Sequence, residues 1–161
     1  KGFDVKVSEV HGMSQRGGTV LSQVRYGDDV QSPVIERGTA DIIVAFEEME
    51  AMRYLDYLKK GGIVIVNDTK IWPLPVVIGK TPYPAGILEA LKDKVRVNVI
   101  NATDMAEELG NPKVMNVIRL GGVVKSMKLD DIDWPGIIAA NVKPKFVDIN
   151  IEAFERGGAL V

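Results

Sequence analysis

The sequence contains no cysteine and a single histidine, His11. Without thiolates, the chain cannot ligate an iron–sulfur cluster, build a cysteine-based zinc site or use a thiol nucleophile. With one histidine, a metal site would need oxygen ligands almost throughout, and we expect no metal site. Redox chemistry must therefore be carried by a bound cofactor or by another chain. The lack of cysteine also fits a cytoplasmic protein, which is the location we expect.

Long apolar runs and an excess of one charge are missing too. No apolar stretch reaches the ~18 residues that a membrane-spanning helix needs, so we expect no membrane span. Twenty Lys and Arg stand against 22 Asp and Glu, and this balance gives no reason to expect nucleic acid as a partner. Hydrophobic residues make up 46% of the chain, which is typical of a globular protein with a core. We expect a single domain over residues 1–161.

Short apolar runs alternate with helical patterns along most of the chain. Residues 41–45, 63–66 and 95–100 are rich in Val and Ile, as strands buried on both faces are. A helical pattern joins the first two of these runs, and we expect it to end at the glycines 61–62. A strand, a helix and a strand in this order predict parallel neighbours. Residues 3–7 form a fourth expected strand. Further helices are expected at about 85–92, 103–109 and 114–127, then after an Asp133 cap, with Ile137 and Ile138 inward, and after an Asn150 cap.

Residues 19–26 and 30–35 interrupt the parallel scheme. Both runs are strand-like, and Gly-Asp-Asp at 27–29 between them is a hairpin signal. Pro33 cannot donate a hydrogen bond to a neighbouring strand, so the second run should lie at an edge. The predicted architecture is a three-layer, Rossmann-like α/β fold, with a mostly parallel sheet and an attached antiparallel hairpin.

A glycine-rich loop follows the first expected strand. Ligands of open α/β sheets bind at the carboxyl ends of strands, and glycines let the backbone approach an anion closely. Arg16 could add a contact to a phosphate or carboxylate. An ordinary structural role fits the composition equally well, because Gly17 and Gly18 could simply turn the chain. His11 has no carboxylate or nucleophile spaced to work with it, so we assign no catalytic residue. The loop reads His11-Gly12-Met13-Ser14-Gln15-Arg16-Gly17-Gly18.

Two further polar segments leave the carboxyl ends of expected strands. Glu47 begins a helix close to Glu48, Glu50 and Asp41. Glutamates at a helix N-terminus are favoured by the helix dipole, so a metal site is the lesser alternative. In the segment that follows residue 66, Trp72 could line a site, contact a partner or fold over the core. The dinucleotide fingerprint G-x-G-x-x-G and the P-loop pattern are both absent.

Several segments, taken in order, resemble one family. The segment 9–20 resembles the signature segment of γ-type subunits of 2-oxoacid:ferredoxin oxidoreductases, most of all the small subunit of the indolepyruvate enzymes. Met-Ser-Gln at 13–15, ahead of Arg-Gly-Gly, favours the arylpyruvate type within that family. The resemblance continues over nearly the whole chain, at 38–41, 47, 50–54, 58–62, 116, 120–121 and 150–157.

The resemblance implies a multi-subunit enzyme that is not expected to be active through this chain alone. A larger subunit would hold thiamine diphosphate, Mg²⁺ and [4Fe–4S] clusters, decarboxylate a 2-oxoacid and pass electrons to ferredoxin. CoA would be the co-substrate that accepts the acyl group. This chain would bind none of these cofactors alone, and would pack in a hetero-oligomer against the larger subunit. The loop from His11 to Gly18, together with Glu47, would help to form the CoA and partner interface.

One departure from the family pattern is visible. Family members begin with a strand, a Gly-x-Gly-Gly-Gln-Gly turn and a helix that have no counterpart ahead of Lys1. We therefore expect that residues 1–161 lack the N-terminal part of the family. An alternative from another class is a stand-alone Rossmann-like module that binds a nucleotide or CoA. A third is a purely structural scaffold subunit.

Overall fold

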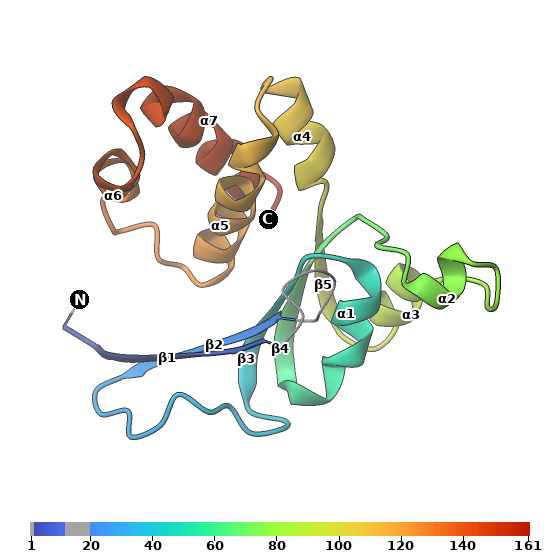
Figure 1. The fold of residues 1–161 in the computed structure, drawn as a ribbon. Helices are drawn as coiled ribbons and strands as arrows, with labels where there is room; N and C mark the ends of the chain where they lie inside the picture. Colours follow the sequence, from blue (N-terminus) through green and yellow to red (C-terminus); the bar gives the residue numbers. More distant parts are fainter. Residues whose placement is uncertain (1, 12–19) are drawn as a thin grey trace.

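The computed structural model describes residues 2–11 and 20–161, except for the side chain at position 11. Three parallel strands form a sheet in the order β3-β4-β5, and β1 and β2 form a separate antiparallel hairpin. The predicted α/β class, with a parallel sheet and an attached hairpin, is confirmed (Figure 1). The strands are β1 (Asp4–His11), β2 (Val20–Gly27), β3 (Ala40–Ala45), β4 (Leu58–Asn67) and β5 (Arg96–Ile100).

Helices cover both faces of the parallel sheet. Helices α1 and α3 pack on one face, and α4, α5 and α7 pack on the other. Within the described ranges, no helix combines the length and the apolar character needed to cross a membrane. The helices are α1 (Glu48–Arg53), η1 (Leu55–Tyr57), α2 (Leu74–Val77), α3 (Ile87–Lys92), α4 (Ala102–Glu108), η2 (Pro112–Val114), α5 (Met115–Ser126), α6 (Trp134–Asn141), η3 (Pro144–Phe146) and α7 (Val147–Gly158).

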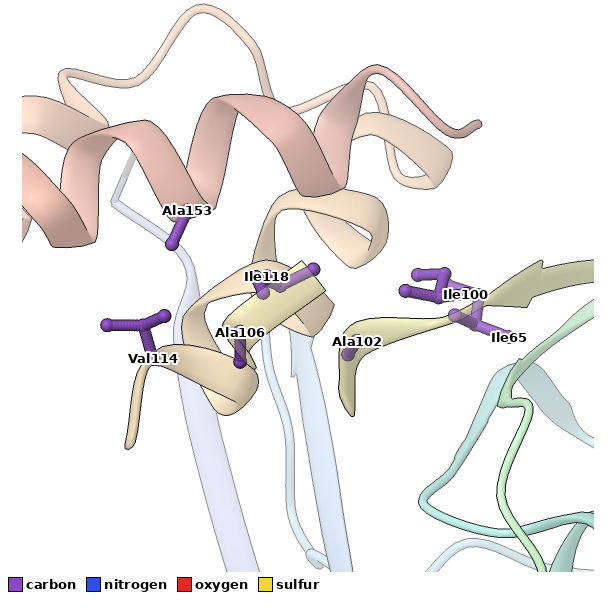
Figure 2. Packing of buried hydrophobic residues seen from close by; sticks show 7 residues of the cluster. All are labelled: Ile65, Ile100, Ala102, Ala106, Val114, Ile118 and Ala153. Atoms are coloured by element: carbon purple, nitrogen blue, oxygen red, sulfur yellow. The ribbon is translucent and has the colours of Figure 1, made fainter. Parts of the chain in front are cut away.

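Strand β4 separates two hydrophobic cores. Successive side chains of a strand point to opposite faces, so Ile65 packs towards α5 and α7, whereas Val64 and Val66 pack towards α1 and α3. This is why the strand reads as a continuous apolar run rather than an alternating one. Figure 2 shows the first core with its buried members labelled: Ile65, Ile100, Ala102, Ala106, Val114, Ile118 and Ala153.

Two glycines bring α5 and α7 into close contact. A Cβ added at Gly121 would lie 2.0 Å from the carbonyl oxygen of Phe154, and one added at Gly157 would lie 1.8 Å from that of Ile118. No side chain fits at either position, so this helix pair depends on glycine.

The hairpin is built differently from the prediction. Strand β2 pairs with β1, from Asp4 opposite Gly27 to His11 opposite Val20, and residues 30–35 form no strand. That segment instead covers one face of the hairpin, with Arg25 Nη1 donating to the carbonyl oxygens of residues 32 and 34 at 2.9 and 3.1 Å. The first strand alternates apolar and polar residues, which is typical of a half-exposed antiparallel strand. It therefore belongs to the hairpin and not to the parallel sheet.

The end of helix α1, which connects β3 to β4, also differs from the prediction. Helix α1 ends at Arg53, and β4 begins at Leu58. Residues 59–62 therefore extend the strand instead of capping a helix. An irregularity in the pairing of β3 with β4, between residues 40 and 42, accommodates this extension, and Lys59 forms an ion pair with Asp41 there.

Two details of the C-terminal helices differ from the prediction, and two agree. Asp133 caps α6 as predicted, because its side chain accepts from the N–H of Gly136 at 3.0 Å. Ile138 is buried as expected, but Ile137 is 43% exposed. Asn150 lies inside α7, where its Nδ2 donates to the carbonyl oxygen four residues earlier at 2.7 Å. It spans a helical turn rather than capping the helix.

Candidate site at the carboxyl edge of the sheet

Most of the predicted loop lies outside the residues that the structure describes. The backbone of His11 pairs with Val20 at one end of the hairpin, so the loop connects two antiparallel strands. The strand before the loop therefore does not belong to the parallel sheet, and the predicted position of the loop at the edge of that sheet was wrong. The roles expected from the family resemblance stay predictions, and the residues concerned are His11, Gly12, Met13, Ser14, Gln15, Arg16, Gly17 and Gly18.

Glu47 lies where it was predicted, at the carboxyl end of β3 and directly before α1. Its side chain is buried, and its carboxylate accepts from the N–H groups of Met49 and Glu50, which caps the helix. The hydroxyl of Tyr83 donates to Oε2 at 3.2 Å. Burial and the negative charge of Glu47 raise the pKa of Tyr83 to about 12, so it remains a donor at neutral pH. Glu47 thus holds the start of α1 in place.

Asn67 organises the next part of this edge. Its side chain is 2% exposed. Its Oδ1 accepts from the N–H of Ala102 at 3.0 Å, and its Nδ2 donates to the hydroxyls of Thr69 and Thr103. This network joins the ends of β4 and β5 to the start of α4. The sequence reasoning missed it, although a polar residue directly after a buried apolar run is the signal that could have found it.

Glu48 is the second buried carboxylate at this edge. It is 3% exposed, and its carboxylate lies 3.9 Å from Nζ of Lys70. Burial raises the pKa of Glu48, and the positive charge of Lys70 opposes that shift only in part. In the part of the chain that the structure describes, no group of three or more His, Cys, Asp or Glu residues could hold a metal ion.

Arg119 approaches the same edge from α5. It is 7% exposed, and its guanidinium carbon lies 4.4 Å from the centroid of the Phe46 ring. Its Nη1 donates to Oδ1 of Asn116 at 2.9 Å, whereas its Nε has no partner among the described residues. Burial lowers the pKa of Arg119. The sequence reasoning noted Asn116 as part of the family resemblance and did not single out Arg119.

A patch of exposed apolar side chains follows β4. Trp72 is 60% exposed, so it does not fold over the core. It belongs to a short segment around α2 that projects from the sheet (Figure 1). We call this surface the α2 patch, and its members, each more than half exposed, are Ile71, Trp72, Leu74, Val77 and Ile78.

The hairpin carries a second patch of this kind. Residues directly opposite each other in the β1–β2 pairing share one face, and one face is apolar while the other is covered by residues 30–35. We call the bare face the hairpin patch. Its members are Val5, Val7, Val20, Val24 and Tyr26, and their exposed fractions run from 45% to 63%.

A cavity of about 340 Å³ lies at the opposite edge of the sheet. It opens beside the early part of β4 and the start of β5, so it is separate from Glu47 and Asn67. None of the residues predicted to form a site lines it. The lining residues are Gly61, Gly62, Lys92, Asp93, Lys94, Val95 and Arg96.

Comparison with known proteins identifies relatives over nearly the whole chain. The family model described as pyruvate ferredoxin/flavodoxin oxidoreductase matches residues 1–160. The indolepyruvate oxidoreductase subunit IorB of Pyrococcus horikoshii is 40% identical, over 97% of this chain and 80% of its own length. IorB of Thermococcus kodakarensis is 39% identical with the same coverage. The ketoisovalerate oxidoreductase subunit VorA of Methanothermobacter marburgensis is 27% identical over 91% of this chain, which is 28% of its own length.

Solved structures share the fold. The γ subunit of a keto/oxoacid ferredoxin oxidoreductase from Geobacter sulfurreducens superposes with a TM-score of 0.66 at 20% identity, covering 99% of this chain and 80% of its own. A 2-oxoglutarate:ferredoxin oxidoreductase from Magnetococcus marinus superposes with a TM-score of 0.67 at 20% identity, covering 99% of this chain but 26% of its own. With the match over residues 1–160 and relatives at 39% and 40% identity, the chain belongs to the pyruvate ferredoxin/flavodoxin oxidoreductase family.

Proposed function

We propose that this chain is the small, γ-type subunit of a CoA-acylating 2-oxoacid:ferredoxin oxidoreductase of the indolepyruvate type, located in the cytoplasm. The observation that carries the proposal is the identity of 39% and 40% to proteins named as subunits of an indolepyruvate oxidoreductase. The chain forms one domain in this proposal, and it acts only in a hetero-oligomer with a larger subunit.

Exposed apolar surface supports the need for a partner. Contiguous apolar patches on a protein surface commonly mark protein interfaces, and this chain carries the α2 patch and the hairpin patch. Trp72 is of the residue type that most often dominates binding energy when it is buried at the centre of an interface. The patches therefore supply the surface that the larger subunit would cover.

The longer relatives also support association of this chain with a larger subunit. In VorA and in the Magnetococcus enzyme, the region that matches this chain is only 28% and 26% of a longer polypeptide. The matching domain is thus covalently joined to further chain in those proteins. The IorB relatives, of which the matched region covers 80%, are named as subunits, and a subunit meets its neighbours by association instead.

The composition of this chain indicates which subunit would bind the cofactors. Because this chain has no cysteine, cluster ligands must come from the larger subunit, which would also hold thiamine diphosphate and Mg²⁺. Electrons would leave for ferredoxin through the complex. The loop from His11 to Gly18 would face CoA or the partner, and Glu47 would contribute to the same interface by fixing the start of α1.

Reconstitution tests this function. We expect co-expression with a larger, thiamine-binding chain to yield a stable complex that reduces ferredoxin only when both indolepyruvate and CoA are present. Arylpyruvates should be preferred over pyruvate as substrates. If this chain fails to associate with any such larger chain, the proposal is contradicted. Micromolar CoA binding by this chain alone, without activity in any complex, would favour the stand-alone binding module.

A further inference from the structure

The buried guanidinium of Arg119 lacks a counter-ion. Removing a charge from water costs several kcal/mol unless a partner compensates it. Arg119 is 7% exposed, and no described carboxylate lies within ion-pair distance of it. Stacking on Phe46 and one hydrogen bond to Asn116 compensate only part of the loss.

Hydrogen-bond donors gather around this charge without acceptors. Nε of Arg119 has no described partner. Asn116 uses its only amide oxygen on Arg119, which leaves its Nδ2 donors facing no described acceptor. Both Asn116 and Phe46 are exposed, so the Asn116 donors lie at the surface, whereas Nε of Arg119 is buried. A cluster that offers a positive charge and several N–H groups is suited to an anion.

Two other described arginines, Arg156 and Arg37, differ from Arg119 in ways that support this interpretation. Arg156 lies near the carboxylates of Glu108 and Glu152, which neutralise it. Arg37 also stands over an aromatic ring, that of Tyr57 at 6.0 Å, but its side chain is exposed and water compensates its charge. Arg119 is both buried and without a carboxylate.

We propose that Arg119 and Asn116, beside the ring of Phe46, bind an anionic group, a phosphate or a carboxylate, at the carboxyl edge of the parallel sheet. Phe46 directly follows β3 and precedes Glu47, which places the site on the side of the sheet that the proposed function assigns to CoA and the partner. The site itself is argued from residues of this chain alone. Only the source of the anion, a phosphorylated ligand or a partner carboxylate, rests on the proposed function.

The first arm of the test measures phosphate binding by the full chain. Thermal unfolding is followed with inorganic pyrophosphate, and separately with CoA, at constant ionic strength, because a ligand that binds the folded state raises Tm with concentration. If the anion is a phosphate, Tm of the wild type and of the control Arg37→Gln rises. Arg119→Gln should weaken this binding at least about tenfold.

Asn116→Asp keeps the test decisive if Arg119→Gln fails to fold. The new carboxylate would stand beside the guanidinium, at a position that already bonds to it at 2.9 Å. It should therefore act as an internal counter-ion, raise Tm in the absence of ligand and compete with the external anion. Anion binding should fall in this variant although the chain is folded.

The second arm measures association with the larger subunit. If neither pyrophosphate nor CoA shifts Tm of the wild type, the proposal requires the anion to be a partner carboxylate. Arg119→Gln and Asn116→Asp should then weaken association about tenfold or more, whereas Arg37→Gln should not.

The two arms separate this inference from the proposed function. Phosphate binding that depends on Arg119 supports the site even if no large subunit is found. If Arg119→Gln and Asn116→Asp bind the anions and the larger subunit as the wild type does, the proposed site is contradicted. The proposed function is still supported in that case if the complex forms.

Discussion

Single polar side chains hold the carboxyl edge of the sheet together. Asn67 and Glu47 form hydrogen bonds with backbone groups and neighbouring hydroxyls. Phe46, which carries Arg119 over its ring, lies at the same edge, directly before Glu47. Glu47 could be predicted from the sequence because an acidic residue at the start of a helix is a local pattern. The contacts of Asn67 with Ala102 and Thr103, and the stacking of Arg119 on Phe46, could not be predicted, because these partners lie more than thirty residues away in the chain.

Asn67→Ala should destabilise the fold. The change removes the acceptor of the buried N–H of Ala102 and both donor bonds to threonine hydroxyls. A buried unsatisfied group costs about 1–3 kcal/mol, so we expect the free energy of unfolding in urea to fall by about that amount. Asn141→Ala is the control, because Asn141 is exposed and bonds only within its own helix. Equal losses in the two variants would contradict the network.

Glu48→Gln should change how stability depends on pH. Burial raises the pKa of Glu48 above its ordinary value of 4.5. Between the unfolded and the raised folded pKa, the folded state binds more protons than the unfolded state, so stability falls as pH rises through that window. The glutamine variant avoids this cost. Its Tm should exceed that of the wild type at neutral pH, and the difference should vanish below the ordinary carboxyl pKa.

The control for this pH profile is Glu155→Gln, because Glu155 is exposed. Its Tm should follow the wild type at every pH. A Glu48→Gln variant that is less stable than the wild type at neutral pH would show that the ion pair with Lys70 outweighs the cost of burial.

At the scale of elements, the glycine contact between α5 and α7 predicts different effects for substitutions at two adjacent glycines, Gly157 and Gly158. A Cβ at Gly157 would lie 1.8 Å from the backbone oxygen of Ile118, whereas one at Gly158 would meet its nearest neighbour at 3.6 Å. We expect Gly157→Ala to cost about 3 kcal/mol or more of unfolding free energy. Gly158→Ala should be neutral or stabilise by up to about 1 kcal/mol, because alanine favours a helix. Similar effects of the two changes in urea unfolding would contradict the packing.

The elements also show where sequence patterns stop being informative. The buried runs around β3, β4 and β5 could be predicted because a continuous apolar run is typical of parallel strands buried on both faces. The strand that pairs with β2 could not be predicted. Gly27-Asp28-Asp29 indicated a hairpin between β2 and residues 30–35, which form no strand. The structure pairs β2 with β1 instead, in a register that local residues do not encode.

At the scale of the whole molecule, the two patches predict partner-dependent behaviour. Leu74→Lys in the α2 patch and Val7→Lys in the hairpin patch each place a charge where we expect the larger subunit to pack. Because both side chains are more than half exposed, Tm of the isolated chain should change little. Affinity for the larger subunit, measured by sedimentation, should fall about tenfold or more for a patch that is buried in the complex.

Ala140→Lys supplies the matched control for these variants. Ala140 is exposed on α6, away from both patches, so the same charge there should leave the affinity unchanged. If both patch variants bind the larger subunit as the wild type does, the interface lies elsewhere on the surface.

The most direct test of the central claim is a titration of the purified larger subunit with this chain, followed by ferredoxin reduction in the presence of indolepyruvate and CoA. We expect neither chain to be active alone, and the rate to rise with added small subunit until it saturates at a fixed stoichiometric ratio. Full activity of the larger subunit alone, unchanged when this chain is added, would contradict the claim that the chain is a working subunit of the enzyme.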